Sequence, residues 1–191
     1  MEPDEILRIF LDSGALLEGH FELRSKLHSD RYFQCAHVLR YPRVAEKLCA
    51  ALAAKMRAGL ADVAGIDGVI APALGGIVVG HEVARALDVR SIFAEKQDGK
   101  LVLRRFAIRP GERYVVAEDV ITRGGRVQET IDIVEQRGGV VAAVAVLVDR
   151  SGGSVRFPYP TFSLLPIDVA THEPAHCPLC RKGLPLVHPG S

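Results

Sequence analysis

The chain has 191 residues and a formal net charge of +1, and 48% of its residues are apolar. This length and composition predict a single folded domain, residues 1–191, and exclude an extended basic surface for nucleic acid. The longest apolar run, Val140–Val148, has nine residues, whereas a membrane-spanning helix needs about 18 or more. Because the first residues also lack a signal-peptide pattern, we expect a cytoplasmic protein without membrane or nucleic-acid partners.

The first forty residues differ in pattern from the rest, and we expect them to form a small hood, residues 1–40. Residues 4–12 carry apolar side chains at helical spacing, with a proline near the start and Ser13-Gly14 at the end, which predicts a short amphipathic helix. From Ala15 to Val38, short apolar and aromatic groups predict extended strands or a hairpin packed over the main sheet.

The middle of the chain alternates helical and strand patterns. Pro42–Arg57 has apolar residues at four-residue steps and predicts a helix. Ile66–Ala71 predicts a short buried strand, and a loop with Gly75 and Gly76 follows it and leads into a second helix. Open α/β sheets bind their ligands at the carboxyl ends of strands. This loop is therefore a candidate site, and the alternative is a plain strand-to-helix turn.

A charged hairpin is predicted after a further short strand, Ser91–Ala94. Its turn signal is Asp98-Gly99. The element has four cations within ten positions, namely Lys96, Lys100, Arg104 and Arg105. It is a candidate arm that closes on an anion, and the alternative is that its charges are merely solvated.

The next stretch indicates a phosphate-binding loop. A buried strand, Tyr114–Ala117, is followed by Glu118 and Asp119, by a glycine-bearing loop, Thr122–Gly125, and by a helix with apolar residues at helical spacing. Glycines let the backbone point several N–H groups inward, and the start of a helix adds its positive dipole end. Adjacent carboxylates would repel a second phosphate, but they suit the vicinal hydroxyls of a ribose or a magnesium ion. A ribose 5-phosphate therefore fits the stretch as a unit.

Residues 115–125, Val-Val-Ala-Glu-Asp-Val-Ile-Thr-Arg-Gly-Gly, resemble the phosphoribosyl-pyrophosphate (PRPP) motif of type I phosphoribosyltransferases. Three other segments narrow the resemblance to orotate phosphoribosyltransferases: Leu23–Phe33, Arg150 after the apolar run, and the tail Cys177-Pro-Leu-Cys180. The resemblance and the alternation of strands with helices both indicate an α/β fold, an open, mainly parallel twisted sheet flanked by helices, with the N-terminal hood. The alternative is a helix cap in some other doubly wound protein.

The resemblance implies that the acidic pair contacts the ribose and favours the positive charge that builds on its ring during transfer. Lys96 and Mg²⁺ bound through PRPP would neutralise the departing pyrophosphate, which the second glycine loop contacts through backbone N–H groups. The implied catalytic residues are Glu118, Asp119 and Lys96. The implied PRPP-binding residues are Glu118, Asp119, Val120, Ile121, Thr122, Arg123, Gly124, Gly125, Arg126, Lys96, Gly75 and Gly76.

For the base, the resemblance implies a pocket near the hood. A planar guanidinium such as that of Arg150 can bind a carboxylate through two parallel hydrogen bonds, and the alternative is a surface pair with Asp149. The implied orotate-binding residues are Thr122, Arg150, Arg24, Tyr32 and Phe33. For the three hood residues the alternative is that both aromatic rings belong to the core and that Arg24 is solvated. The resemblance also implies a homodimer, in which the charged hairpin reaches the neighbouring subunit's site.

Two features depart from the family pattern. Arg123 and Arg126 stand where the phosphate loop commonly has Thr and Ser, and the hairpin is short and has no histidine. We expect the two cations to offset the two lost hydroxyl donors, so that PRPP binding is kept, while rate and affinity stay open. Two other functions therefore stay open as well: a phosphoribosyltransferase for another nucleobase, and a PRPP-binding regulator without catalysis.

The end of the chain adds an edge strand over residues 161–168, where Pro166 is tolerated, and a tail, residues 170–191. The tail holds two histidines and two cysteines at spacings that a tetrahedral zinc site can use: His172, His176, Cys177 and Cys180. A zinc-stabilised structural protein is thus a third hypothesis. Because such half-sites are common by chance, no metal ligand is firmly assigned.

Overall fold

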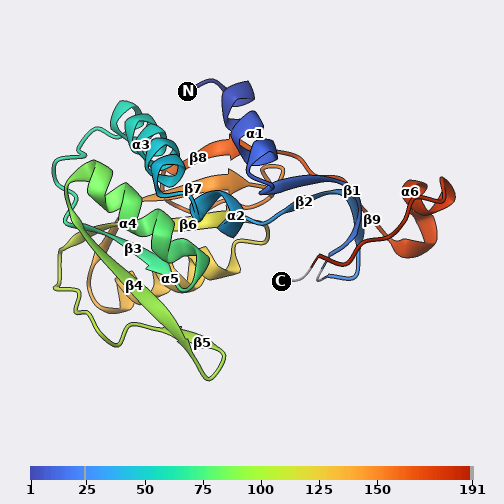
Figure 1. Cartoon of the computed structure of the whole chain (residues 1–191). Coiled ribbons are helices and arrows are strands. Elements are labelled where there is room, and N and C mark those ends of the chain that lie inside the picture. The colour runs from blue at the N-terminus through green and yellow to red at the C-terminus, as the bar shows by residue number, and fades with distance from the viewer. Residues whose placement is uncertain (24, 190–191) are drawn as a thin grey trace.

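The computed structural model of the protein describes residues 1–23 and 25–189. Figure 1 shows an α/β body, a smaller sheet beside it, and a C-terminal tail that returns to the smaller sheet. In chain order the elements are α1 (Pro3–Asp12), β1 (Leu16–Glu22), β2 (His28–Phe33), α2 (Ala36–Leu39), α3 (Pro42–Gly59), β3 (Gly68–Pro72), α4 (Gly75–Leu87), β4 (Arg90–Gln97), β5 (Lys100–Val102), β6 (Arg113–Ile121), α5 (Gly125–Gln136), β7 (Val140–Asp149), β8 (Thr161–Pro166), β9 (Thr171–His172), the 3-10 turn η1 (Pro174–His176) and α6 (Pro178–Arg181).

The main sheet has six strands within the described ranges, in the order β5-β4-β3-β6-β7-β8. Neighbours from β4 to β8 run parallel, and β5 pairs with β4 in the antiparallel direction. The central strand β7 is built almost wholly of valine and alanine, as expected for a parallel strand that is covered on both faces. The predicted open, mainly parallel sheet flanked by helices is confirmed.

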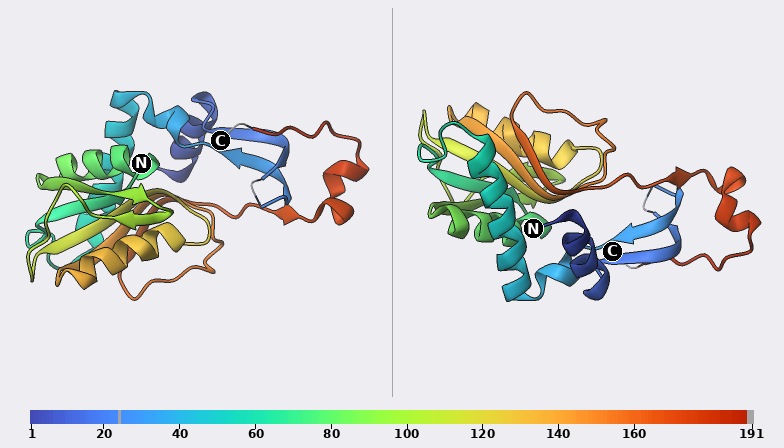
Figure 2. Two further views of the ribbon diagram at one scale, coloured as in Figure 1. Left: turned by 90° about the horizontal axis from the view of Figure 1, so that it is seen from below. Right: turned by 90° about the horizontal axis from the view of Figure 1, so that it is seen from above.

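Alternate side chains of the sheet enter two cores, because successive residues of a strand point to opposite faces. On β6, Val115 and Ala117 pack in the core that contains α1, α3 and α4. Tyr114 and Val116 pack in the other core, with α5. Figure 2 shows this arrangement, with α3 and α4 on one face of the sheet and α5 on the other.

Strand β6 is longer than the sequence pattern predicts. We expected the strand to end at Ala117, before the acidic pair, but it continues to Ile121. Glu118 and Val120 pair with Val146 and Val148 of β7. Acidic residues are depleted in strands, and here pairing with the long neighbouring strand overrides that local preference.

The hood is a separate antiparallel sheet, β1-β2-β9. The predicted hairpin supplies β1 and β2, and the C-terminal tail supplies β9, which pairs His172 with His28. Further along the tail, the Val187 N–H donates to the His20 carbonyl at 2.8 Å. The tail is thus part of the hood. Leu16 of β1 and Phe33 of β2 pack in the same core as α1 and the main sheet. The rest of the small sheet extends beyond the edge of the main sheet (Figures 1 and 2).

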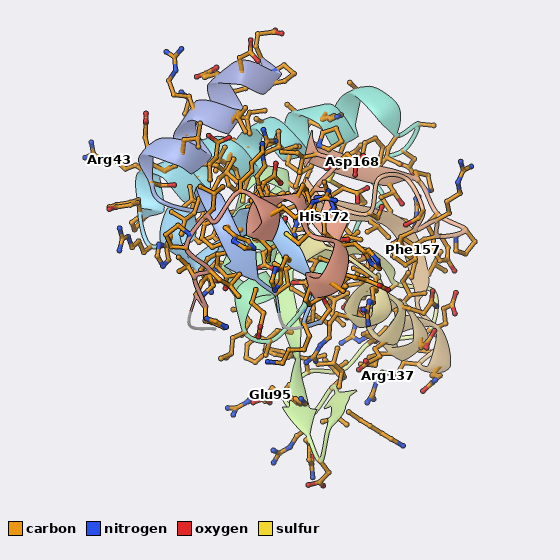
Figure 3. All side chains as sticks on the ribbon, turned by 90° about the vertical axis from the view of Figure 1, so that its right-hand side faces the viewer. Arg43, Glu95, Arg137, Phe157, Asp168 and His172 are labelled. Carbon is orange, nitrogen blue, oxygen red and sulfur yellow. The ribbon has the colours of Figure 1, made fainter. Side chains whose placement is uncertain are left out.

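The hairpin of β4 and β5 projects from the body. Asp98 and Gly99 have positive φ angles of 49° and 86° and form its turn. At its base the Arg105 guanidinium bonds to the Glu95 carboxylate, with a distance of 2.8 Å between Nε and Oε2. Figure 3 shows Glu95 on this projecting element. Among the helices of residues 1–23 and 25–189, none has the length and apolar character needed to cross a membrane.

Candidate active site

The loop between β6 and α5 forms a cavity of about 250 Å³. One continuous stretch, residues 120–127, lines it together with Glu129. Gly124 precedes the helix with a φ of 75°, and a Cβ at this position would lie 2.6 Å from Val155 Cγ1. Phe157, labelled in Figure 3, lies on the same side of Gly124. The left-handed conformation and the close contact both require glycine here.

This cavity suits an anion. The first backbone N–H groups of a helix have no partner within it, and they carry the positive end of the helix dipole. In α5 these groups belong to cavity-lining residues. Arg123 and Arg126, which replace the family's hydroxyl residues, are exposed and line the same hollow. The predicted phosphate loop is therefore a compact, positively charged hollow.

The acidic pair lies directly before the loop and is largely buried. Glu118 is only 6% exposed, and its Oε1 accepts a hydrogen bond of 3.0 Å from the Asp119 N–H. Burial, and next the neighbouring Asp119 charge, raise the pKa of Glu118 well above its usual range. Burial also raises the pKa of Asp119. Neither carboxylate has an ion-pair partner among the described residues. The pair is thus an acidic centre that a cation or hydroxyl donors would stabilise.

The second glycine loop meets this acidic centre, because β3 and β6 are neighbours and their carboxyl ends lie together. A Cβ added to Gly75 would lie 2.9 Å from the carboxyl carbon of Asp119. At Gly76 an added Cβ would lie 2.9 Å from Glu118 Oε1. Glycine lets the start of α4 approach both carboxylates. The two glycine loops that the sequence predicts as candidate sites therefore form one site.

Arg150 lies at the end of β7, next to the hood. Its guanidinium carbon is 5.2 Å from the centre of the Phe33 ring. Its Nε is buried and has no hydrogen-bond partner in the described structure, and burial lowers the pKa of the guanidinium. The alternative of a surface pair with Asp149 is not what the structure shows, because Asp149 Oδ1 accepts a 2.8 Å hydrogen bond from the Ser151 N–H instead. Arg150 is thus a cation without an anionic partner among the residues that the structure describes.

The hood connects this arginine to the acidic pair. Phe33 contacts Arg150, and two residues further Cys35 Sγ lies 3.8 Å from the Asp119 carbonyl oxygen. Tyr32 is half-buried beside Phe33, and its ring centre is 5.9 Å from that of Phe21. Arg24, the remaining predicted hood contact, lies outside the described residues.

Lys96 and Thr122 occupy different places. Thr122 is exposed at the rim of the phosphate cavity. Lys96 is exposed on β4, where it pairs with Leu101 across the projecting hairpin, and it does not line the cavity. Its strand partner Leu101 donates a backbone hydrogen bond of 3.4 Å to Glu129 of the cavity lining, so the hairpin lies next to the loop, while Lys96 itself is not in the lining.

The two tail cysteines also form a cluster, but with other histidines than predicted. His20 and His28 of the hood approach Cys177 and Cys180. The predicted His176 is exposed and lies 3.7 Å from Glu173, and the predicted His172 is in β9 outside the cluster. Sequence spacing could not find His20 and His28. The sequence shows only that both histidines lie within the segment predicted to form the hairpin of the hood.

Comparison with known proteins agrees with this geometry. Residues 40–176 match the family described as phosphoribosyl transferase domain. The chain is 50% identical to the orotate phosphoribosyltransferase of Desulforamulus reducens, over 100% of this chain and 98% of that protein. It is 53% identical to the orotate phosphoribosyltransferase of Heliobacterium modesticaldum, over 100% of this chain and 99% of that protein.

Two solved structures show the shared fold. The orotate phosphoribosyltransferase from Aeropyrum pernix superposes with a TM-score of 0.70 at 24% identity, over 85% of this chain and 93% of that chain. The adenine phosphoribosyltransferase from Rhodothermus marinus gives a TM-score of 0.64 at 21% identity, over 86% of this chain and 99% of that chain. Because enzymes named for different bases share the fold, the fold alone does not identify the base.

Proposed function

This chain belongs to the orotate phosphoribosyltransferases, within the phosphoribosyltransferase family, and from that premise we propose how its residues carry out the reaction. The reaction joins N1 of orotate to C1 of the ribose of PRPP. The C1–O bond breaks and its electron pair leaves with pyrophosphate, while N1 of orotate loses its proton to the pyrophosphate or to water, giving orotidine 5'-monophosphate for pyrimidine synthesis. The proposed roles rest on one observation. The phosphate cavity, the largely buried acidic pair and Arg150 all lie at the carboxyl ends of the neighbouring strands β6 and β7.

The 5-phosphate of PRPP would bind in the cavity before α5. The backbone N–H groups of Gly124 to Val127 and the hydroxyl of Thr122 are the hydrogen-bond donors there. Arg123 and Arg126 add positive charge at the rim, which supports retained phosphate binding despite the absent hydroxyls. This assignment uses the helix start for the phosphate and leaves the carboxylates free for the ribose.

Glu118 and Asp119 would hold the ribose hydroxyls and favour the positive charge that develops on the ring. The pair also fits Mg²⁺, because two largely buried carboxyl groups with no ion-pair partner among the described residues offer the hard oxygen donors that this ion prefers. When bound there with PRPP, Mg²⁺ would supply positive charge beside the departing pyrophosphate. Gly75 and Gly76 leave the backbone of α4 open to the same group.

Orotate would bind between the hood and the end of β7. The half-buried guanidinium of Arg150, with its buried Nε, can donate two parallel hydrogen bonds to the orotate carboxylate, which would give it the partner that the described residues do not supply. Phe33 and Tyr32 lie on the hood side, where aromatic rings suit a planar base. A purine has no carboxylate, so the same pocket would leave Arg150 unpaired and would disfavour purines.

Orotate turnover is the direct test. The purified protein should consume orotate, followed by the loss of its absorbance, in the presence of PRPP and Mg²⁺. Adenine, hypoxanthine, xanthine and uracil, followed by product detection, should not be consumed. The loss of activity on removing the divalent ion tests the Mg²⁺ assignment separately. If no base is consumed while PRPP still raises the Tm, catalysis is excluded and the chain is a PRPP-binding regulator.

We also propose a homodimer in which the hairpin of one chain completes the site of its partner. Lys96 is exposed on a projecting element and does not line the cavity of its own chain. Figure 1 shows this hairpin extending from the body. Mixing inactive Lys96→Ala and Asp119→Asn chains tests this arrangement. With shared sites, random re-association should restore about one quarter of the wild-type activity, because half of the dimers are mixed and each has one intact site. An inactive mixture of folded dimers would place Lys96 in its own chain's site, and an active Lys96→Ala homodimer would place it outside any site.

A further inference from the structure

The hood holds a cluster of two histidines and two cysteines that plays no part in the proposed transfer. It joins His20 at the end of β1, His28 at the start of β2, and Cys177 and Cys180 of the tail. One potential ligand atom from each residue lies within 4.8 Å of all the others. Three of the four side chains are buried, with exposures of 3% for His20, 4% for His28 and 1% for Cys177.

The distances match those between the corners of a tetrahedral metal site. His20 Nε2 lies 3.6 Å from each sulfur, His28 Nδ1 lies 3.2 Å from Cys180 Sγ, and the two nitrogens are 3.0 Å apart. Tetrahedral zinc, with bonds of about 2.0–2.1 Å to nitrogen and 2.3 Å to sulfur, separates N from S by about 3.6 Å and N from N by about 3.4 Å.

A hydrogen bond to the backbone fixes the orientation and the tautomer of His20. His20 Nδ1 lies 2.9 Å from the Leu184 carbonyl oxygen, so this nitrogen donates its proton to the carbonyl. The lone pair of Nε2 then points to His28 and both sulfurs. Metal-bound histidines typically donate the other ring N–H in this way. A buried histidine with a purely structural role needs only hydrogen-bond partners, whereas two thiols lie next to Nε2 of His20.

The backbone also prepares the two sulfurs. Cys177 directly precedes the one-turn helix α6, which begins at Pro178, and Cys180 lies within that helix. The Cys-x-x-Cys spacing places both sulfurs on the same side of this turn, as in many structural zinc sites. Both cysteines are free thiols in the structure, so they are available as thiolates.

We propose that His20, His28, Cys177 and Cys180 bind one structural Zn²⁺ ion, with release of the two thiol protons. The ligand set has four protein donors and no open position, which distinguishes it from a catalytic zinc site. The ion fastens α6 and the tail to the strands of the hood, at the end of the hood that lies away from the α/β body (Figures 1 and 2). This site is independent of the PRPP and orotate contacts.

Metal analysis of the full chain tests the proposal. The protein is produced without a histidine tag in zinc-supplemented medium and purified under reducing conditions. We expect about one zinc per chain by mass spectrometry of the metal. Replacement by Co²⁺ should give the intense thiolate-to-cobalt absorption of a tetrahedral site. Purified protein with negligible zinc, no cobalt spectrum and two freely titrating thiols, or with a Cys177–Cys180 disulfide, would overturn the site.

Variants separate the proposed ligands from the other tail histidine. Cys180→Ala and His28→Ala should lose zinc, whereas His176→Ala should keep the full amount, because His176 is exposed and outside the cluster. If Cys180→Ala chains are insoluble, chelation of the wild-type protein provides the same comparison. Chelation should lower the Tm, and added zinc should restore it. Full zinc in folded Cys180→Ala, or loss of zinc in His176→Ala, would refute this ligand set.

Discussion

Replacing Arg150 with methionine should nearly abolish orotate use while making the free protein more stable. The Nε of Arg150 is buried without a hydrogen-bond partner among the described residues, and burial lowers the pKa of the guanidinium. A buried donor without a partner destabilises the free protein. In the proposed complex the same guanidinium gains the orotate carboxylate. Methionine keeps an unbranched side chain in contact with Phe33 and removes only the charge and the donors.

The size of both effects follows from the contacts. Two charge-assisted hydrogen bonds, at about 1.5–3 kcal/mol each, contribute about 3–6 kcal/mol to binding of the transition state. Since about 1.4 kcal/mol corresponds to a factor of ten, kcat/KM for orotate should fall about 10²- to 10⁴-fold. Removing the unpaired donor should raise the free energy of unfolding by about 1–3 kcal/mol.

Steady-state kinetics with orotate and urea unfolding measure the two effects on the same protein. The PRPP-dependent rise in Tm should stay at its wild-type value, because the phosphate cavity is intact. Arg8→Met on the exposed side of α1 is the matched control and should change neither quantity. Retained orotate turnover would refute the assigned role. A lowered free energy of unfolding would identify Arg150 as a residue of structural importance instead.

Three further predictions concern the glycines and the acidic pair. Gly75→Ala should lower the free energy of unfolding by about 1–3 kcal/mol, because the added Cβ would contact Asp119. In an Asp119→Ala background, urea unfolding should show a smaller loss. An equal loss in both backgrounds would exclude that contact. The raised pKa of Glu118 means that its contribution to stability is fully present below pH 4.5 and is lost as pH rises toward about 9. Wild type should therefore lose stability relative to Glu118→Gln by up to about 1.4 kcal/mol per pH unit, and parallel urea curves across this range would contradict the buried state of Glu118. Gly124→Ala should lower the free energy of unfolding by about 1–3 kcal/mol, because Gly124 has a positive φ and an added Cβ would contact Val155. Gly125→Ala is the control and should lower it much less, because an added Cβ there meets open space. Similar melting temperatures for the two variants would contradict this explanation.

The phosphate loop and the acidic pair could be predicted because their chemistry is contiguous in the sequence. The strand, the acids, the glycines and the helix start follow one another, so local pattern is enough to define a cradle. The second glycine loop required one rule beyond local pattern, namely that the carboxyl ends of parallel strands lie together. That rule placed Gly75 and Gly76 at the correct edge.

Other features depended on contacts that the sequence does not encode locally. The predicted end of β6 at Ala117 was wrong, because pairing with β7 extends the strand through Glu118 and Asp119. The histidines of the cysteine cluster could not be chosen by spacing, because His20 and His28 lie in the other terminal region of the chain. The place of Lys96 relative to the cavity involves a projecting element, whose surroundings in a dimer are not contained in one chain.

The composition of the hood also bears on how the protein is made. The ribosome produces Tyr32 and Phe33 early, but the strand that completes their sheet, β9, comes from the far end of the chain. At roughly 5–20 residues per second, the interval between the synthesis of β2 and that of β9 is on the order of 10 s. The α/β body can therefore form during translation, while the proposed base-binding side stays incomplete until β9 has been made. If the proposed sites are correct, a nascent chain would be able to hold PRPP before it can hold orotate.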